Sequence, residues 1–174
     1  MTVREVRRLG DPVLRTACDP VTRFDDSLDR LVDDLLETVL LPGRAGLAAN
    51  QIGVGLAAFS YNVDGRHGYV INPVIAETAG EYDGPEACLS IPRLTAPTVR
   101  AMRTVVTGVD RRGDPVIVEG TEEMSRVLLH ETDHLRGVLF LDRLTGKARK
   151  DAFRQLRQLS QHSQHSPGVS SGVR

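Results

Sequence analysis

The sequence of 174 residues lacks several features that would assign it to a class of protein at once. It has two cysteines and no tryptophan, aromatic residues make up 4% of it, and 22 Lys and Arg balance 23 Asp and Glu. Two cysteines cannot build a disulfide framework. The balanced charge lacks the broad positive field of a dedicated nucleic-acid-binding protein, so we expect no direct nucleic-acid specificity.

Long hydrophobic runs are missing as well. No apolar run approaches the roughly 20 residues that span a bilayer. The amino end carries Arg4, Arg7 and Arg8 where a signal peptide needs an apolar core. We therefore expect a cytoplasmic protein with no membrane association. The length fits one domain that buries its own hydrophobic core.

The apolar residues that are present predict a mixture of helices and strands. A stripe with steps of three and four over residues 28–40 predicts a helix that Pro42 and Gly43 end. Apolar runs that flank turn residues predict two strand pairs, at 56–61 with 69–75 and at 104–109 with 116–118. Since these elements do not alternate as βαβ units, the fold class is predicted to be α+β.

The end of the chain changes in character. Apolar residues at helical spacing over 152–159 predict a C-terminal helix, and a polar stretch rich in Ser, Gln and His follows it. We expect a catalytic domain over residues 1–159 and a disordered polar tail over residues 160–174, because such a tail has nothing to bury.

The motif HETDH at residues 130–134 carries the most chemistry. It lies on a helix predicted from an N-cap at Thr121 to Arg136. Residues i and i+4 share one helix face, so His130 and His134 can reach one metal ion, and Glu131 beside them can move a proton of the water that the ion activates. The simpler interpretation is two histidines on the polar edge of a helix.

A metal hydrolase needs a third protein ligand and an open position. The long pattern H-E-x-x-H-x-x-G-x-x-H is excluded because position 140 is Phe, and no glutamate follows Glu131. The other histidines lie in a predicted turn or in the tail: His67, His162 and His165. Cys88 is thus the best candidate, and its thiolate suits zinc or ferrous iron.

The two cysteines are expected to differ. Pro92, four residues after Cys88, predicts an irregular segment there and not a core strand. Cys18 has no histidine nearby, so we interpret it as a structural residue. The expected architecture is a single domain with antiparallel β-sheets around a central metal-binding helix, together with an N-terminal and a C-terminal helix.

Three segments together resemble a known family. RAGLAANQ at 44–51, EACLS at 86–90 and HETDH at 130–134 resemble, in order and spacing, the signature motifs of the peptide deformylases, and the likeness extends from Val6 to Leu144. The resemblance implies a metal-dependent amidohydrolase that removes the N-formyl group from the initiator methionine of nascent polypeptides. It also implies one Fe²⁺ per chain, for which Zn²⁺, Ni²⁺ or Co²⁺ can substitute.

The resemblance also assigns roles to single residues. It makes Cys88, His130 and His134 the metal ligands and Glu131 the general acid/base, in agreement with the argument from the residues. It implies that the Gln51 amide and the Leu89 N–H bind the developing oxyanion. It further implies that the backbone at Ala45 and Gly46 pairs with N-formylmethionyl peptides, and that the C-terminal helix touches the ribosome.

Two positions depart from the family pattern. Arg44 stands in place of a leading glycine, and Ala87 replaces the glycine before the cysteine. If the backbone at either position needs a positive φ, a side chain there costs about 1–2 kcal/mol of stability.

Two other functions stay open at this point. One is another metallopeptidase with the same HExxH site, and the other is a metal-binding relative with weak or altered activity that binds formylated peptides.

Overall fold

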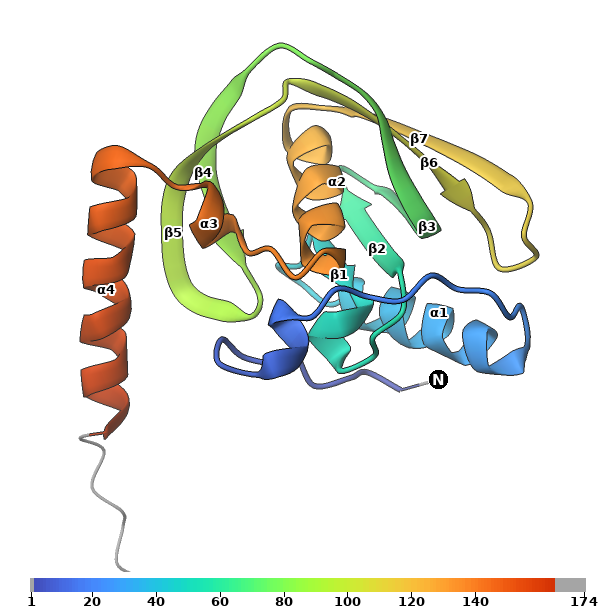
Figure 1. The fold of residues 1–174 in the computed structure, drawn as a ribbon, viewed down its shortest axis with the longest axis horizontal. Helices are drawn as coiled ribbons and strands as arrows, with labels where there is room; N and C mark the ends of the chain where they lie inside the picture. The colour runs from blue at the N-terminus through green and yellow to red at the C-terminus, as the bar shows by residue number, and fades with distance from the viewer. Residues whose placement is uncertain (1, 165–174) are drawn as a thin grey trace, which may run out of the picture.

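Figure 1 shows the fold in a computed structural model that describes residues 2–164. The helices are η1 (Pro12–Arg15), α1 (Asp26–Val39), η2 (Ala49–Ile52), α2 (Glu122–Leu135), α3 (Phe140–Arg143) and α4 (Gly146–Gln164). The strands are β1 (Gly46–Ala48), β2 (Ala58–Val63), β3 (Arg66–Ala79), β4 (Tyr82–Cys88), β5 (Ile91–Arg100), β6 (Arg103–Val109) and β7 (Pro115–Thr121).

The strands form two antiparallel sheets. The larger sheet has the order β1-β2-β3-β6-β7, and β4 and β5 form a two-stranded sheet. Helix α2 lies centrally, with the larger sheet on one side and the β4–β5 hairpin on the other (Figure 1). The predicted α+β class and the central helix between antiparallel sheets are confirmed.

The predicted helices α1 and α2 and the two predicted strand pairs are present, with changes at their ends. Helix α1 begins after Asp25, whose carboxylate caps the helix by accepting the N–H of Ser27. The predicted strand pairs are β2 with β3 and β6 with β7. Thr121 occupies the N-cap position of α2, although its side chain makes no capping hydrogen bond.

The prediction of an irregular segment around Cys88 was wrong for the residues on either side of the turn at 89–90. Residues Tyr82–Cys88 and Ile91–Arg100 form an antiparallel hairpin with Pro92 inside β5, and the register shifts between Ala87 and Cys88. Both strands of a two-stranded sheet are edge strands, and an edge tolerates proline because one side of the strand needs no N–H donor. Pro92 is exposed there, while its neighbour Ile91 is buried.

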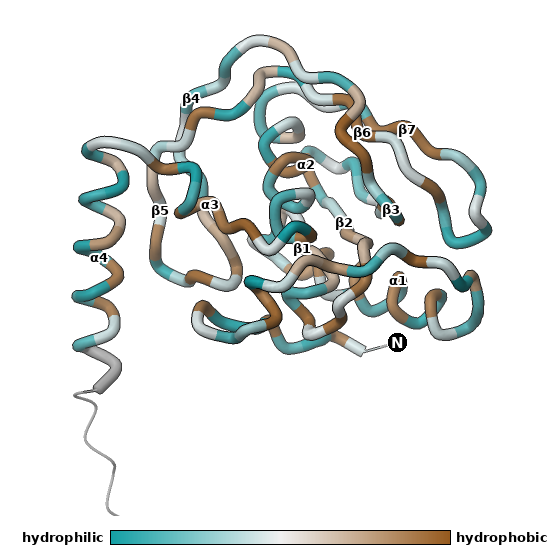
Figure 2. The backbone as a smooth tube through the Cα atoms, viewed as in Figure 1, coloured by the Kyte–Doolittle hydropathy of each residue, from teal (hydrophilic) through white to brown (hydrophobic). Residues whose placement is uncertain are grey.

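The core brings the helices onto the sheets. Val127 and Leu128 of α2 pack with buried residues of the large sheet such as Phe59 and Val106. Ala152 of α4 packs in a second cluster with apolar residues of β5 and α3. Figure 2 shows hydrophobic stretches on β6, on β7 and on part of α2, whereas α4 at the edge of the molecule carries mainly hydrophilic residues. The site helix is therefore held by apolar packing against the larger sheet.

Helix α4 extends further than predicted. It continues to Gln164, so the expected boundary after Leu159 falls inside the helix. Residues 165–174 of the predicted tail lie outside the described residues. Over the part of the chain that the structure describes, no helix combines the length and the apolar character needed to cross a membrane.

Candidate active site

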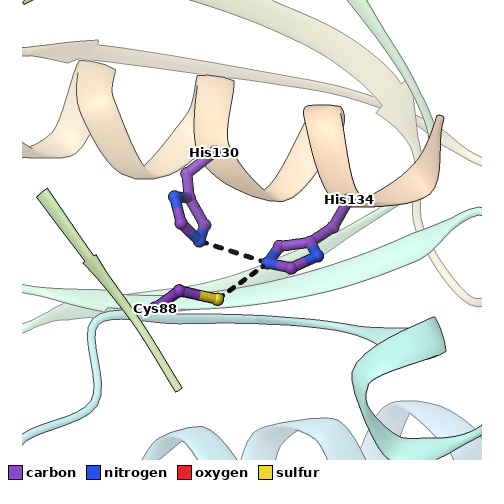
Figure 3. Close-up of side chains that lie close together, drawn as sticks. All are labelled: Cys88, His130 and His134. Atoms are coloured by element: carbon purple, nitrogen blue, oxygen red, sulfur yellow. Dashed lines mark hydrogen bonds between the residues drawn. The ribbon is translucent and has the colours of Figure 1, made fainter. Parts of the chain in front are cut away.

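Helix α2 and strand β4 bring three metal-capable side chains together. His130 and His134 project from one face of α2, and Cys88 at the end of β4 points toward them (Figure 3). The His134 Nε2 atom lies 3.2 Å from the His130 Nε2 and 3.2 Å from the Cys88 Sγ. All three ligand atoms lie within 4.8 Å of one another, and all three residues are buried.

This donor set fits a divalent transition metal. Ligand atoms that sit 2.0–2.3 Å from a tetrahedral ion lie roughly 3.3–3.8 Å from one another, and the observed separations of 3.2 Å are close to that. A thiolate with two imidazoles suits zinc or ferrous iron. Burial lowers the pKa of His134 well below its usual range, which keeps the imidazole neutral and free to donate a lone pair to the ion.

Glu86 orients His130 through the ring nitrogen that points away from the other two metal-capable residues. Its Oε1 lies 2.6 Å from the His130 Nδ1, so the other ring nitrogen faces the site. Glu86 and Cys88 share one face of β4 because side chains alternate along a strand. Although burial alone raises the pKa of Glu86, hydrogen bonds from Arg100 and His130 outweigh it and hold the pKa at about 2.

Behind Glu86 lies a buried network of charges. Arg100 donates to both carboxylate oxygens of Glu86, at 2.9 and 2.7 Å, and to Asp133 at 2.7 Å. Arg143 donates to the same Asp133 from the protein surface, and Arg126 donates to Glu86 at 3.0 Å. Sequence reasoning assigned no role to these residues. The two-residue spacing of Glu86 and Cys88 could have indicated Glu86, whereas Arg100 and Arg126 carry no local signal.

Glu131 is buried against a glycine. It is 3% exposed, and burial raises the pKa of its carboxyl to about 7. A Cβ placed on Gly46 would lie 2.3 Å from the Glu131 Oε1. The small residue at position 46 is therefore required by the close approach of the β1 backbone to the carboxylate.

Gln51 of η2 faces the same site, and its neighbour Asn50 contacts the backbone of α2. The Gln51 Nε2 lies 3.7 Å from the Cys88 Sγ and donates to the Ser90 hydroxyl at 3.2 Å, and its Oε1 accepts the Ala48 N–H at 2.9 Å. The amide is thus held with its nitrogen toward the metal-capable group. The Asn50 amide donates to the His134 carbonyl at 2.6 Å and ties η2 to α2. Sequence reasoning had not assigned Asn50.

The remaining predicted residues surround a cavity of about 420 Å³. Its lining includes Ala45, Gly46 and Gln51, Leu89 in the turn after β4, and the metal-capable residues Cys88 and His130. The Ala45 carbonyl already accepts the Asn62 N–H at 2.7 Å, so that acceptor is used within the sheet. The cavity thus brings together the predicted site residues except His134, which lies behind its wall in contact with Cys88 and His130.

The two departures from the family pattern cause no backbone strain. Four non-glycine residues in the described part of the chain have positive φ angles, and neither Arg44 nor Ala87 is among them. Arg44 donates to the Thr38 carbonyl at 3.0 Å, and Ala87 pairs with Thr95 in the hairpin. The cost considered for a side chain at a positive φ therefore applies to neither position.

Cys18 lies apart from the cavity. Its N–H donates to the carbonyl of Leu135 at the end of α2. Burial raises the pKa of its thiol to about 11, which leaves it protonated and unreactive at neutral pH. The structural role expected for Cys18 fits this position.

Comparisons with known proteins point to one family. The model of the family described as polypeptide deformylase matches residues 3–150. A peptide deformylase of Acidothermus cellulolyticus is 50% identical over 157 residues, which cover 90% of this chain and 87% of the relative. A peptide deformylase of Parafrankia sp. is 47% identical over 171 residues, covering 97% and 93% of the two chains.

Solved structures give the same result for the fold. The crystal structure of a peptide deformylase from Legionella pneumophila superposes with a TM-score of 0.85 at 34% identity, over 95% of this chain and all of that one. The peptide deformylase from Thermus thermophilus gives a TM-score of 0.83 at 39% identity, over 90% and 94% of the two chains.

Proposed function

The chain belongs to the peptide deformylase family, and from this premise we propose how its own residues perform the reaction. The activity is hydrolysis of the N-formyl group from the initiator methionine of nascent polypeptides. Identity close to one half over most of the chain supports this activity over the two alternatives. The observation that carries the proposal is the convergence of Cys88, His130 and His134 beside a cavity that Glu131 also lines.

We propose that Cys88, His130 and His134 hold one ferrous ion. When bound, the ion supplies Lewis acidity to the water and the formyl carbonyl that enter the cavity. Glu86 keeps His130 in the orientation that exposes its Nε2. The proposal for iron rests on the family resemblance and on the thiolate–imidazole donor set, which zinc, nickel and cobalt also fit.

Glu131 is proposed to move the proton. Its carboxylate takes a proton from the attacking water and delivers it to the amine nitrogen as the bond between formyl carbon and nitrogen breaks, which releases formate and a free amino terminus. A pKa raised by burial to about 7 suits both steps, since the group is then a competent base and a competent acid near neutral pH.

Two donors are proposed to stabilise the oxygen of the formyl group as it gains charge. The Gln51 Nε2 is held close to the Cys88 Sγ, and Leu89 is the next residue in the chain. Each such donor is typically worth about 3–4 kcal/mol in the transition state. The substrate backbone would run along the edge strand β1 at Ala45 and Gly46, with Gly46 as the main partner because the Ala45 carbonyl is engaged.

The direct test is turnover of a formyl-Met peptide by protein that is loaded with ferrous iron and kept from oxygen. Release of formate, together with one metal ion per chain, supports the proposal. Tight binding of the peptide without release of formate, at full metal content, would contradict it. Cleavage of internal peptide bonds with formyl-Met peptides left intact would point to the other metallopeptidase.

We also propose a cytoplasmic location, where nascent chains are made, and contact with the ribosome through α4. Five basic residues support this contact: Lys147, Arg149, Lys150, Arg154 and Arg157. Charge reversal of Lys150 and Arg157 should abolish salt-sensitive cosedimentation with ribosomes, whereas reversal of Arg112 on the β6–β7 hairpin should not. Equal cosedimentation of both variants would contradict the proposed contact between α4 and the ribosome.

A further inference from the structure

The two histidines of the site are not held in the same way. The Glu86 carboxylate lies 2.6 Å from the His130 Nδ1 and fixes that ring. The His134 Nδ1 is buried as well, but it has no hydrogen-bond partner within the described part of the chain. The place of the His134 ring therefore depends on where the backbone at the end of α2 is held.

Asn50 of η2 contacts that backbone. Its Nδ2 donates to the His134 carbonyl at 2.6 Å, and the residue is 0% exposed. The same carbonyl accepts the Gly137 N–H at 3.0 Å, and the next carbonyl, that of Leu135, accepts the Cys18 N–H at 2.8 Å. The end of α2 thus stays hydrogen-bonded without Asn50, so the helix does not need this contact to satisfy its carbonyls.

The Asn50 side chain is also a poor choice for stability alone. Its Oδ1 is buried and finds no hydrogen-bond partner among the residues that the structure describes. A buried polar atom without a partner costs free energy, and native proteins contain few of them. The buried amide is therefore better explained by what it positions than by the stability that it adds.

The contact joins the proposed oxyanion donor to the helix of the metal ligands. Asn50 precedes Gln51 in η2, which is a 3-10 helix of four residues. Gln51 has two further ties, because its carbonyl accepts the Arg7 N–H at 2.7 Å and its Oε1 accepts the Ala48 N–H at 2.9 Å. Neither of these ties reaches α2. Since α2 is packed against the larger sheet, loss of the Asn50 contact should move the short η2 and leave α2 in place.

We propose that Asn50 is a positioning residue, which sets the distance between the Gln51 amide and the metal ligands on α2. This inference rests on the proposed deformylase function, in which that amide donates to the formyl oxygen as the oxygen gains charge. Asn50 acts through Gln51, because it is not among the residues that line the cavity. A donor that acts on charge developing in the transition state contributes to kcat, so its displacement should lower kcat and leave KM nearly unchanged.

The experiment compares the wild type, Asn50→Ala, Gln51→Ala and the double variant. It measures kcat and KM for a formyl-Met peptide with ferrous-loaded protein. Asn50→Ala should lower kcat about tenfold, which is less than the loss of the whole donor, with KM within about twofold of the wild type. In the Gln51→Ala background the same change should alter kcat by less than about twofold, because the group that Asn50 positions is then absent.

Two further readouts separate positioning from structural damage. Each protein should hold one metal ion per chain, and the visible absorption of cobalt-loaded Asn50→Ala should match that of the wild type, because the ligands do not move. Asn50→Ser, whose hydroxyl lies one bond closer to the backbone than the amide nitrogen, should show the same pattern as Asn50→Ala.

Thr104→Ala is the matched control. Thr104 is also 0% exposed, and its Oγ1 lies 2.7 Å from the Ser125 Oγ at the other end of α2. Its removal therefore deletes a buried side chain that ties a neighbouring element to the same helix, far along the helix from the ligands. Thr104→Ala should lower the melting temperature and leave kcat unchanged.

Several results would overturn the inference. An unchanged kcat in Asn50→Ala, or an equal loss of kcat with and without the Gln51 amide, would mean that Asn50 does not act through Gln51. A changed cobalt spectrum would mean that it acts on the ligands. Failure of both Asn50 variants to fold, while Thr104→Ala folds, would assign Asn50 a structural role. Failure of the proposed function itself looks different, because metal-loaded wild-type protein would then not hydrolyse the formyl-Met peptide.

Discussion

Gly46→Ala is expected to impair the reaction far more than the fold. The added Cβ would lie 2.3 Å from the Glu131 Oε1 and 2.8 Å from its Cδ. Non-bonded carbon and oxygen atoms prefer separations near roughly 3.5 Å, so the carboxylate has to move by about 1 Å. Gly46 does not have a positive φ, so the alanine adds no backbone strain.

The size of the effect follows from that displacement. A misplacement of about 1 Å in a catalytic group costs on the order of 10²-fold in rate. One extra methyl in a packed site costs roughly 1–3 kcal/mol of stability. We therefore expect kcat/KM for a formyl-Met peptide to fall about a hundredfold, while the protein stays folded with one metal ion per chain.

The assay combines formate release by ferrous-loaded protein with metal analysis and a thermal melt. Gly55→Ala is the matched control, because a Cβ at Gly55 would meet nothing within 4 Å and its φ is ordinary. Its activity should equal that of the wild type. A Gly46→Ala variant that is fully loaded with metal and within about threefold of the wild-type kcat/KM would refute the argument, because it would mean that the position of Glu131 does not limit the reaction.

Three further predictions concern other residues of the site. Cys88→Ala should purify with far less than one metal ion per chain, because it removes the thiolate from the ligand set. Cys18→Ser should keep its metal and its activity. Loss of metal in Cys18→Ser would mean that the wrong cysteine was assigned. Gln51→Ala should lower kcat by about 10²-fold with metal retained, and an unchanged kcat would exclude its amide from the transition state. The low pKa of Glu86, about 2 against an ordinary 4.5, stabilises the fold above pH 4.5 by about 3 kcal/mol, and this stability is lost as the pH falls toward 2. Denaturant titrations from about pH 6 to pH 2.5 should show a smaller decline for Glu86→Gln than for the wild type, and parallel curves would contradict the assignment.

Local chemistry made much of the site predictable. The i and i+4 spacing of His130 and His134 fixes both rings on one helix face, whatever the rest of the chain does. Cys88 followed by elimination, because the other histidines lay in a turn or a tail. The strand pairs β2–β3 and β6–β7 followed from apolar runs around turn residues. The family resemblance then added roles for Gln51, Leu89, Ala45 and Gly46 that spacing alone does not give.

The hairpin of β4 and β5 shows where local rules fell short. Pro92 predicts a break in the strand, yet it lies in a two-stranded sheet in which each strand has an unpaired edge. Whether a strand is central or at an edge depends on which distant segments pair with it. The residues around Pro92 do not indicate which distant segments pair with the strand, so the sequence alone does not predict that it is an edge strand.

By itself the sequence determined the donor set, the helix that carries two of its members, and the family. Only the tertiary structure decided what surrounds that set. It placed Arg100 and Arg126 against Glu86 behind the ligands, and Gly46 under the Glu131 carboxylate. The reason is physical: helix and strand periods fix which residues share a face, whereas the burial of a charge and the space left for it depend on segments that meet only when the chain folds.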